Sequence, residues 1–370
     1  MGRDALTTAA DVVAFGASRR RRAAFAWSVI VSASLLGACA GAPRVAEYRE
    51  GTLAGLPAMV DGRAAFRQVF CDIHRRLADE GGTDERCETL LWRLSDEPTT
   101  PAVAALALPA DARPLRFLLV TGAFDDCYGD EGLPFHEAAL ALAAAGHRLD
   151  TLRLSGRSSA ESNAEALARD LRPRIDEGSE RLVLIGYSKG VVDILQLLAA
   201  HPEVAESVAA VVGVAGPVQG TPLAEAGAGL YDGLLSHALA GRCSPGDGGV
   251  IDSLVPEVRR RALAAHPLPE GVRFYSLMAL PEWDVVAAGL KPSWRWLARS
   301  SRFNDGQVRV QDAVLPGATV LGFANADHWG IALRIERAMP HIAGRTLDRP
   351  YPQRALLEAI LLALGGEPAP

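Results

Sequence analysis

The stretch Leu182-Val183-Leu184-Ile185-Gly186-Tyr187-Ser188-Lys189-Gly190 decides the fold that this sequence predicts. Its four leading apolar residues predict a strand covered on both faces, as in a parallel sheet. A helix-like segment, Gly190–Ala200, follows at once, so Ser188 lies in a tight turn from strand to helix. Glycine two positions away on either side leaves room for such a turn, which lifts a serine hydroxyl above the end of the sheet. Ser188 is therefore a candidate nucleophile, and a purely structural turn is the alternative.

Strands and helices alternate on both sides of this turn. Further strands are predicted at Arg116–Thr121, His147–Leu154, Val208–Val214, Val272–Ala279 and Ala318–Phe323, and helices at Leu133–Ala145, Ser162–Glu177 and Tyr351–Leu364. This alternation predicts an α/β fold with a doubly wound, mostly parallel sheet, because right-handed crossovers place helices on both faces. The apolar, glycine-containing segment 223–270 interrupts the alternation, and we expect it to form a helical cap over the carboxyl edge of the sheet.

The N-terminal residues have the pattern of an export signal. Four arginines, Arg19–Arg22, precede the uncharged stretch Ala24–Ala38, whose roughly fifteen residues are few for a membrane-spanning helix. The stretch runs into Leu36-Gly37-Ala38-Cys39, which resembles the lipobox of bacterial lipoproteins. This resemblance implies that residues 1–38 are a lipoprotein-type signal peptide and that lipid on Cys39 anchors the protein to a membrane of the cell envelope. The alanine after Cys39 favours the outer membrane. An ordinary secretory signal or an anchor helix is the alternative.

Residues 39–110 are predicted to form a linker and a small N-terminal helical extension, and residues 111–370 the main domain. Helix-like runs at Arg63–Ala78 and Asp84–Leu94 make up the extension, and four prolines from residue 98 to residue 114 mark its end.

Export permits disulfides, and four cysteines follow Cys39. They allow three pairings. We favour Cys71 with Cys87, because both lie in the extension, and consequently Cys127 with Cys243. Free buried thiols are the alternative.

Composition excludes some classes of protein. Hydrophobic residues make up 49% of the chain, which is enough for a large core. The net charge is -6, and the longest arginine run lies beside the N-terminal apolar stretch. Because no basic stripe is left for phosphates, nucleic acid is not an expected partner.

A serine hydroxyl needs a base, and His328 is the best-placed histidine because it follows the last predicted strand by a short loop. A carboxylate must in turn orient the imidazole. Asp305, in a polar turn, and Asp284 both lie between the last two predicted strands and are both candidates. Asp327 adjoins His328 directly, which makes a bond to the far ring nitrogen awkward. A structural histidine and aspartates that cap turns are the alternatives.

An oxyanion formed by attack on a carbonyl needs backbone amides as donors. The Lys189 amide is the first candidate, because it opens the helix after Ser188. The second is expected in the loop after Arg116–Thr121, at Ala123 or Phe124. The acidic residues that follow would suit a cationic substrate or calcium, but such a run is more often a solvated loop. We therefore predict neither a metal site nor a cofactor; the residues concerned are Asp125, Asp126, Asp130 and Glu131.

Four motifs together resemble those of bacterial lipases and carboxylesterases of the α/β-hydrolase superfamily, namely Gly186–Gly190, Gly216–Ala224, Asn304–Val308 and Asp327–Trp329. The resemblance covers about residues 116–339 and implies the α/β-hydrolase fold. An Asn-Asp-Gly turn carries the catalytic acid in such lipases, so the resemblance favours Asp305 over Asp284. Two features depart from the pattern. Thr121-Gly122 stands where those enzymes usually have His-Gly, and a lysine follows the serine.

The sequence thus predicts a serine hydrolase that cleaves carboxylic esters, of a lipid or another small molecule, through an acyl-enzyme on Ser188. His328 would be the base and Asp305 its partner. The membrane, reached through lipidated Cys39, is the other expected partner. An acyltransferase or thioesterase of the cell envelope would use the same groups. A non-catalytic lipoprotein binding module on the same fold is the alternative from another class.

Overall fold

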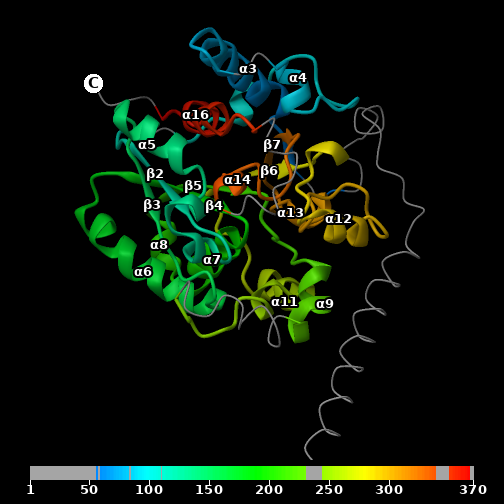
Figure 1. The fold of residues 1–370 in the computed structure, drawn as a ribbon. Coiled ribbons are helices and arrows are strands. Elements are labelled where there is room, and N and C mark those ends of the chain that lie inside the picture. The colour runs from blue at the N-terminus through cyan, green and yellow to red at the C-terminus, as the bar shows by residue number, and fades with distance from the viewer. Residues whose placement is uncertain are drawn as a thin grey trace, which may run out of the picture. The chain divides into compact units, whose positions relative to one another are not determined.

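The computed structural model describes residues 56, 59–82, 85–109, 111–230, 244–338 and 350–366, all within the unit Ala42–Pro370. Within these residues, seven strands form one sheet in the order β1-β7-β6-β5-β4-β2-β3 (Figure 1). Every pairing between neighbouring strands is parallel, which confirms the predicted α/β sheet. The strands are β1 Val60–Asp61, β2 Leu115–Val120, β3 Leu149–Leu152, β4 Arg181–Tyr187, β5 Val208–Val214, β6 Arg273–Ala279 and β7 Thr319–Ala324.

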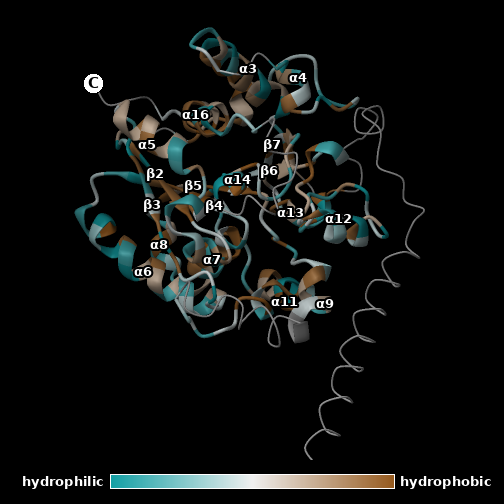
Figure 2. Ribbon diagram, viewed as in Figure 1, coloured by the Kyte–Doolittle hydropathy of each residue, from teal (hydrophilic) through white to brown (hydrophobic). Residues whose placement is uncertain are grey.

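Helices cover both faces of the sheet, and the burial of β4 shows why. Val183 and Ile185 belong to the core under α3 (Arg63–Asp79), α5 (His136–Ala144) and α16 (Gln353–Ala363). Leu182 and Leu184 belong to the core under α6 (Ala160–Glu177) and α7 (Lys189–Ala200). Successive side chains of a strand point to opposite faces, so a strand between two helical layers must be apolar throughout. In Figure 2 the strands are largely brown, whereas α6 carries teal residues along its length.

The shorter elements connect these layers. They are α4 Cys87–Leu90, η1 Val103–Ala105, η2 Asp125–Gly132, α8 Pro202–Ala205, α9 Pro222–Leu230, η4 Asp252–Leu254, α11 Pro256–Ala265, η5 Trp283–Val285, α12 Lys291–Leu297, α13 Val310–Ala313 and α14 Ile335–Ala338. The predicted cap segment 223–270 contains α11 and η4 and most of α9. Its described part packs on α6 and α7 through Ala224 and Leu254, which contact Ala160 and Val192.

The N-terminal extension completes one edge of the sheet. β1, which the sequence analysis did not predict, pairs with β7 through Val60 and Asp61. Only Cys87–Leu90 of the predicted helix Asp84–Leu94 is helical among the described residues, and beyond residue 90 the chain turns to pair with β7 instead. The Trp92 amide donates to the carbonyl of Phe323 at 2.8 Å, and the indole Nε1 of Trp92 donates to the carbonyl of Leu280 at 2.8 Å.

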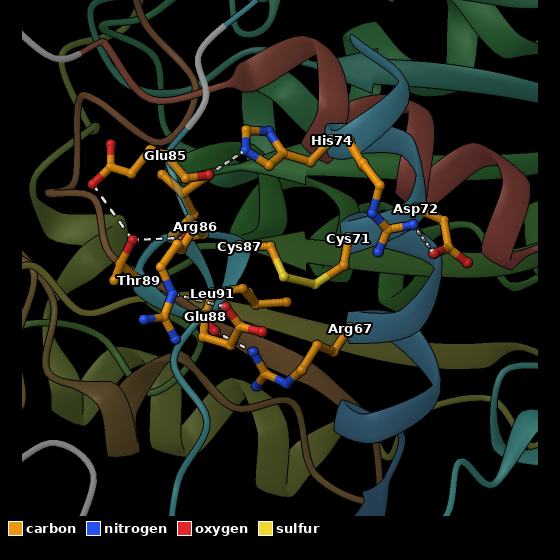
Figure 3. Close-up of a disulfide and its surroundings, with 12 residues drawn as sticks. Arg67, Cys71, Asp72, His74, Glu85, Arg86, Cys87, Glu88, Thr89 and Leu91 are labelled. Atoms are coloured by element: carbon orange, nitrogen blue, oxygen red, sulfur yellow. Dashed lines mark hydrogen bonds and ion pairs between the residues drawn. A yellow bond between two sulfur atoms is a disulfide. The ribbon is translucent and has the colours of Figure 1, made fainter. Parts of the chain in front are cut away.

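A disulfide fastens the two helices of the extension to each other, as predicted. Cys71 on α3 and Cys87 at the start of α4 have their Cα atoms 5.4 Å apart (Figure 3). In the same view, the His74 ring on α3 is hydrogen-bonded to the carbonyl of Glu85, 2.6 Å from Nε2. Cys127 is disulfide-bonded as well. Its predicted partner, Cys243, lies outside the described residues, as does Cys39.

Candidate active site

The turn from β4 into α7 places Ser188 at the carboxyl edge of the sheet. Ser188 has φ 51° and ψ -125°, a strained conformation that is typical of a nucleophile elbow. A Cβ on Gly186 would lie 2.7 Å from the Val191 nitrogen, and one on Gly190 would lie 2.5 Å from the Val120 carbonyl oxygen. Both positions therefore need glycine for the strand and the helix to approach this closely.

Two hydrogen bonds link the three residues that were predicted to act together. Ser188 Oγ lies 2.8 Å from His328 Nε2, and His328 Nδ1 lies 2.8 Å from Asp305 Oδ2. The three side chains belong to residues only 8%, 2% and 2% exposed, so little water competes for these bonds. His328 follows β7 by a short loop, and its carbonyl accepts the hydroxyl of Tyr187 at 2.8 Å. The structure thus brings the predicted nucleophile, base and acid into one chain of contacts.

The turn that carries Asp305 leaves one of its carboxylate oxygens for the histidine. Asp305 Oδ1 accepts the backbone amides of Gln307 and Val308 at 2.8 and 2.7 Å, and Oδ2 faces His328. Gly306, with φ 96°, permits the turn, and its amide donates to Asn304 Oδ1 at 2.9 Å. The Asn-Asp-Gly motif therefore fixes the carboxylate before any substrate binds.

The two other aspartates have different positions. Asp284 lies exposed on η5, and no bond joins it to His328 within the described residues. Asp327 is buried, and its two oxygens accept the amides of Gly330 and Ala287 at 2.7 and 2.6 Å. Burial raises the pKa of Asp327 to about 6. Asp327 thus stabilises the loop that carries His328 by accepting these two backbone amides.

The three backbone amides predicted to bind an oxyanion differ in the hydrogen bonds that they make. Lys189 is the first residue of α7, and within the described residues its amide has no acceptor, nor does that of Ala123. The amide of Phe124 donates to the carbonyl of Gly156 at 3.0 Å. The only N–H of Phe124 is thus hydrogen-bonded in this structure, and its role at the oxyanion site stays a prediction. Lys189 and Ala123 remain the predicted pair.

A buried carboxyl group supports the loop of Ala123, a role that the sequence did not indicate. Asp125 is 3% exposed, and its Oδ2 accepts the amide of Gly122. Burial and the neighbouring charge of Asp126 raise the pKa of Asp125 well above its usual range. The acidic run suggested a solvated loop or a cation site. No group of metal-ligating residues occurs in the described part of the chain, and Asp125 instead points inward to the backbone of this loop.

The side chain of Lys189 is buried. Its Nζ donates to Asp193 one turn along α7, and both side chains are 1% exposed. Asp193 Oδ2 also accepts the side-chain amide of Asn163 from α6 at 2.8 Å. This pair ties the first turn of α7, which carries the Lys189 amide, to the neighbouring helix.

An apolar pocket of about 330 Å³ opens beside Ser188 and His328. Asp125 and His328 are its only lining residues with acidic or basic side chains, among those the structure describes. Most of the wall is aromatic or aliphatic, and the cap segment contributes four residues to it. The apolar lining includes Phe124, Leu223, Ala224, Ile251, Leu254 and Trp329.

Comparison with solved structures gives a strong match over nearly the whole chain. The metagenomic carboxyl esterase MGS0156 is 34% identical, with a TM-score of 0.72 over 86% of this chain and 98% of that protein. The mature lipase BlEst2 of Bacillus licheniformis is 23% identical, with a TM-score of 0.47 over 60% of this chain and 86% of that protein. No protein-family model matches the sequence, and no curated protein matches it.

Proposed function

We propose, on the premise that this chain belongs to the carboxyl esterase family of the α/β-hydrolase superfamily, that it hydrolyses carboxylic esters through an acyl-enzyme on Ser188. The observation that carries the proposal is the pair of 2.8 Å bonds from Ser188 through His328 to Asp305. This arrangement supplies a nucleophile, a base and a group that orients the base, which together activate the serine for acyl transfer.

The reaction follows from these contacts in two halves. Ser188 Oγ attacks the ester carbonyl carbon while His328 Nε2 takes the hydroxyl proton, and Asp305 stabilises the imidazolium that forms. The amides of Lys189 and Ala123 would donate to the oxyanion, where the positive end of α7 adds to the stabilisation. The bond from the carbonyl carbon to the alcohol oxygen then breaks, and His328 gives the proton to the leaving alcohol. In the second half a water loses a proton to His328 and attacks the acyl carbon; the bond to Ser188 Oγ breaks, His328 returns the proton to Oγ, and the carboxylic acid is released.

The pocket favours an ester with an uncharged, hydrophobic acyl group. Its lining offers no arginine or lysine within the described residues, so a carboxylate or phosphate in the acyl part would lose its hydration without a partner. A small-molecule or lipid ester fits this lining. A thioester, or transfer to an alcohol in place of water, would use the same acyl-enzyme.

A fluorophosphonate probe and p-nitrophenyl esters test the proposal together. The parent chain should be labelled and should release p-nitrophenol, whereas Ser188→Ala should do neither, and His328→Ala should be strongly slowed in both. His266→Ala, which changes an exposed histidine on the cap, is the matched control. A parent chain that is neither labelled nor active would support the binding module instead. Ester product in the presence of an added alcohol would support an acyltransferase.

We also propose that the protein is a lipoprotein of the cell envelope, anchored through Cys39. The support is the arginine-rich and apolar N-terminal pattern that ends in Leu36-Gly37-Ala38-Cys39. None of the helices in the described ranges combines the length and apolar character needed to cross a bilayer. Labelled palmitate should enter the parent chain in bacterial cells but not Cys39→Ala. Equal incorporation by the two chains would contradict the assignment.

A further inference from the structure

A patch that combines aromatic and cationic side chains lies around α12, and we call it the basic aromatic surface. Its members are Trp283, Lys291, Arg295, Trp296, Arg299 and Phe303. The guanidinium carbon of Arg295 lies 4.6 Å from the ring centre of Trp283, and Lys291 Nζ lies 5.1 Å from it. Trp296 and Phe303 are 37% and 39% exposed, which is unusual for side chains of this size.

The charge of this surface is opposite to that of the whole protein. Residues 283–303 contain four basic residues and one acidic residue, whereas the chain has a net charge of -6. Lys291, Arg295 and Arg299 follow one another at four-residue spacing, which places them along one side of α12 and its C-terminal turn. No carboxylate lies within 4.0 Å of any of the three in the part of the chain that the structure describes. These cations are thus available to an external anion.

The basic aromatic surface borders the active site. α12 packs directly against the turn of Asp305, because the indole of Trp294 donates to the carbonyl of Asn304 at 3.1 Å. Trp329, which follows His328 and lines the pocket, belongs to the same apolar cluster as Trp283 and Trp294. α12 also contacts α9, whose Leu223 and Ala224 form part of the pocket wall. Any binding partner that covered the basic aromatic surface would therefore lie beside the pocket.

The first described residues of the chain lie near this surface. Leu56 and Met59 pack on the cluster that contains Val308 and Val310. The amide of Val310 donates to the carbonyl of Phe303 at 2.9 Å, so this cluster adjoins the basic aromatic surface. About 17 residues separate Cys39 from Leu56 and span at most about 60 Å. A membrane that holds Cys39 is thus within reach of α12.

We propose that the basic aromatic surface docks onto a bilayer that contains anionic phospholipids. Tryptophan and phenylalanine suit the boundary between headgroups and acyl chains, and arginine and lysine bind the lipid phosphates while their stems lie on apolar surface. Each cation near an anionic surface changes partitioning by about fivefold, so three together give about a hundredfold. Docking does not depend on the ester chemistry, and it would bring the pocket to the lipid phase.

Quenching of tryptophan fluorescence by brominated lipids tests this contact on the chain without residues 1–38, which the proposed processing removes. All proteins carry Ser188→Ala, so that no lipid is cleaved. The vesicles are brominated phosphatidylcholine, either alone or mixed at about two to one with phosphatidylglycerol. We expect stronger quenching on the mixed vesicles and its reversal at about 1 M NaCl, where the Debye length is about 3 Å.

Two triple variants distinguish docking through the basic aromatic surface from a general effect of the protein's net charge. Lys291→Gln/Arg295→Gln/Arg299→Gln should lose the part of the quenching that depends on phosphatidylglycerol, with a docked-to-undocked ratio about a hundredfold lower. Arg75→Gln/Arg86→Gln/Arg153→Gln removes the same charge from side chains that are 70%, 77% and 56% exposed, and it should keep that part. The same triple changes with Ser188 intact should retain p-nitrophenyl ester hydrolysis, which controls for folding. Equal quenching on both vesicle types, equal loss in both triple variants, or no association with the mixed vesicles would overturn the proposal.

Discussion

Replacing Asp305 by asparagine changes one atom of the side chain and should nearly abolish turnover. In the parent, Oδ1 accepts the amides of Gln307 and Val308, and Oδ2 accepts from His328 Nδ1. The asparagine oxygen must take the Oδ1 position, because an NH₂ group there would face two N–H donors. The NH₂ group then donates to His328 Nδ1, so the ring proton moves to Nε2. A histidine that carries its proton on Nε2 cannot accept one from Ser188.

The size of this effect follows from the loss of the correct tautomer. An asparagine in the equivalent position of a serine protease lowers kcat by about 10⁴, and we expect a similar loss here. This corresponds to about 5 kcal/mol of transition-state stabilisation. The protein should remain folded, because the carbonyl oxygen still binds the turn of Gln307 and Val308.

Steady-state hydrolysis of p-nitrophenyl butyrate measures the effect. Asp305→Asn should lower kcat with little change in KM, since the pocket wall is not altered. Asp284→Asn is the matched control, because it makes the same chemical change on an exposed aspartate, and it should keep the parent rate. If Asp305→Asn retained more than about a tenth of the parent kcat, the tautomer argument would be refuted.

Three further outcomes are expected. Asp125→Leu removes the acceptor of the Gly122 amide and should lower kcat by about tenfold to a hundredfold. Asp125→Asn keeps an acceptor, so its kcat should stay within severalfold of the parent value. Equal losses of kcat in the two variants, measured by stopped flow, would argue that Asp125 does not support the loop. Replacing Cys71 and Cys87 by alanine opens a loop with a sequence separation of 16. Because the disulfide limits the conformational entropy of the unfolded chain, urea titrations should show a free energy of unfolding lower by about 3 kcal/mol. An unchanged free energy of unfolding would contradict this reasoning. Asp327 has a folded-state pKa of about 6, above the ordinary value of 3.8, so the folded state holds its proton more tightly. Its contribution to stability should therefore fall as pH rises from about 4 to 6, and Asp327→Asn should flatten urea-unfolding profiles across this range.

The nucleophile turn was predictable because its signal is local. A buried strand, two glycines and a following helix lie within nine residues around Ser188, and tertiary contacts only refine their arrangement. The choice of Asp305 over Asp284 needed the family resemblance, because both lie between the last two strands. The structure separates them by burial, a property that the spacing of residues does not contain.

The predictions that failed depended on long-range contacts. Val60 and Asp61 are too few to show a strand period, and they form β1 only because β7 offers a partner. The segment after residue 90 has a helix-like pattern, but pairing of Trp92 with Phe323 overrides it. The burial of Asp125 beneath its loop likewise depends on the folded loop itself.

The short strand β1 also determines where the chain can be shortened. A protein expressed from residue 111 would contain every residue of the proposed catalytic machinery but would lack β1, Leu91 and Trp92. The outer backbone groups of β7 would then have no partner, and the apolar residues now under the extension, such as Leu321, would be uncovered. An open apolar edge of this kind recruits strands from other molecules. Such a trimmed enzyme is expected to aggregate, so expression for crystallisation or biocatalysis should retain the residues from the linker onward.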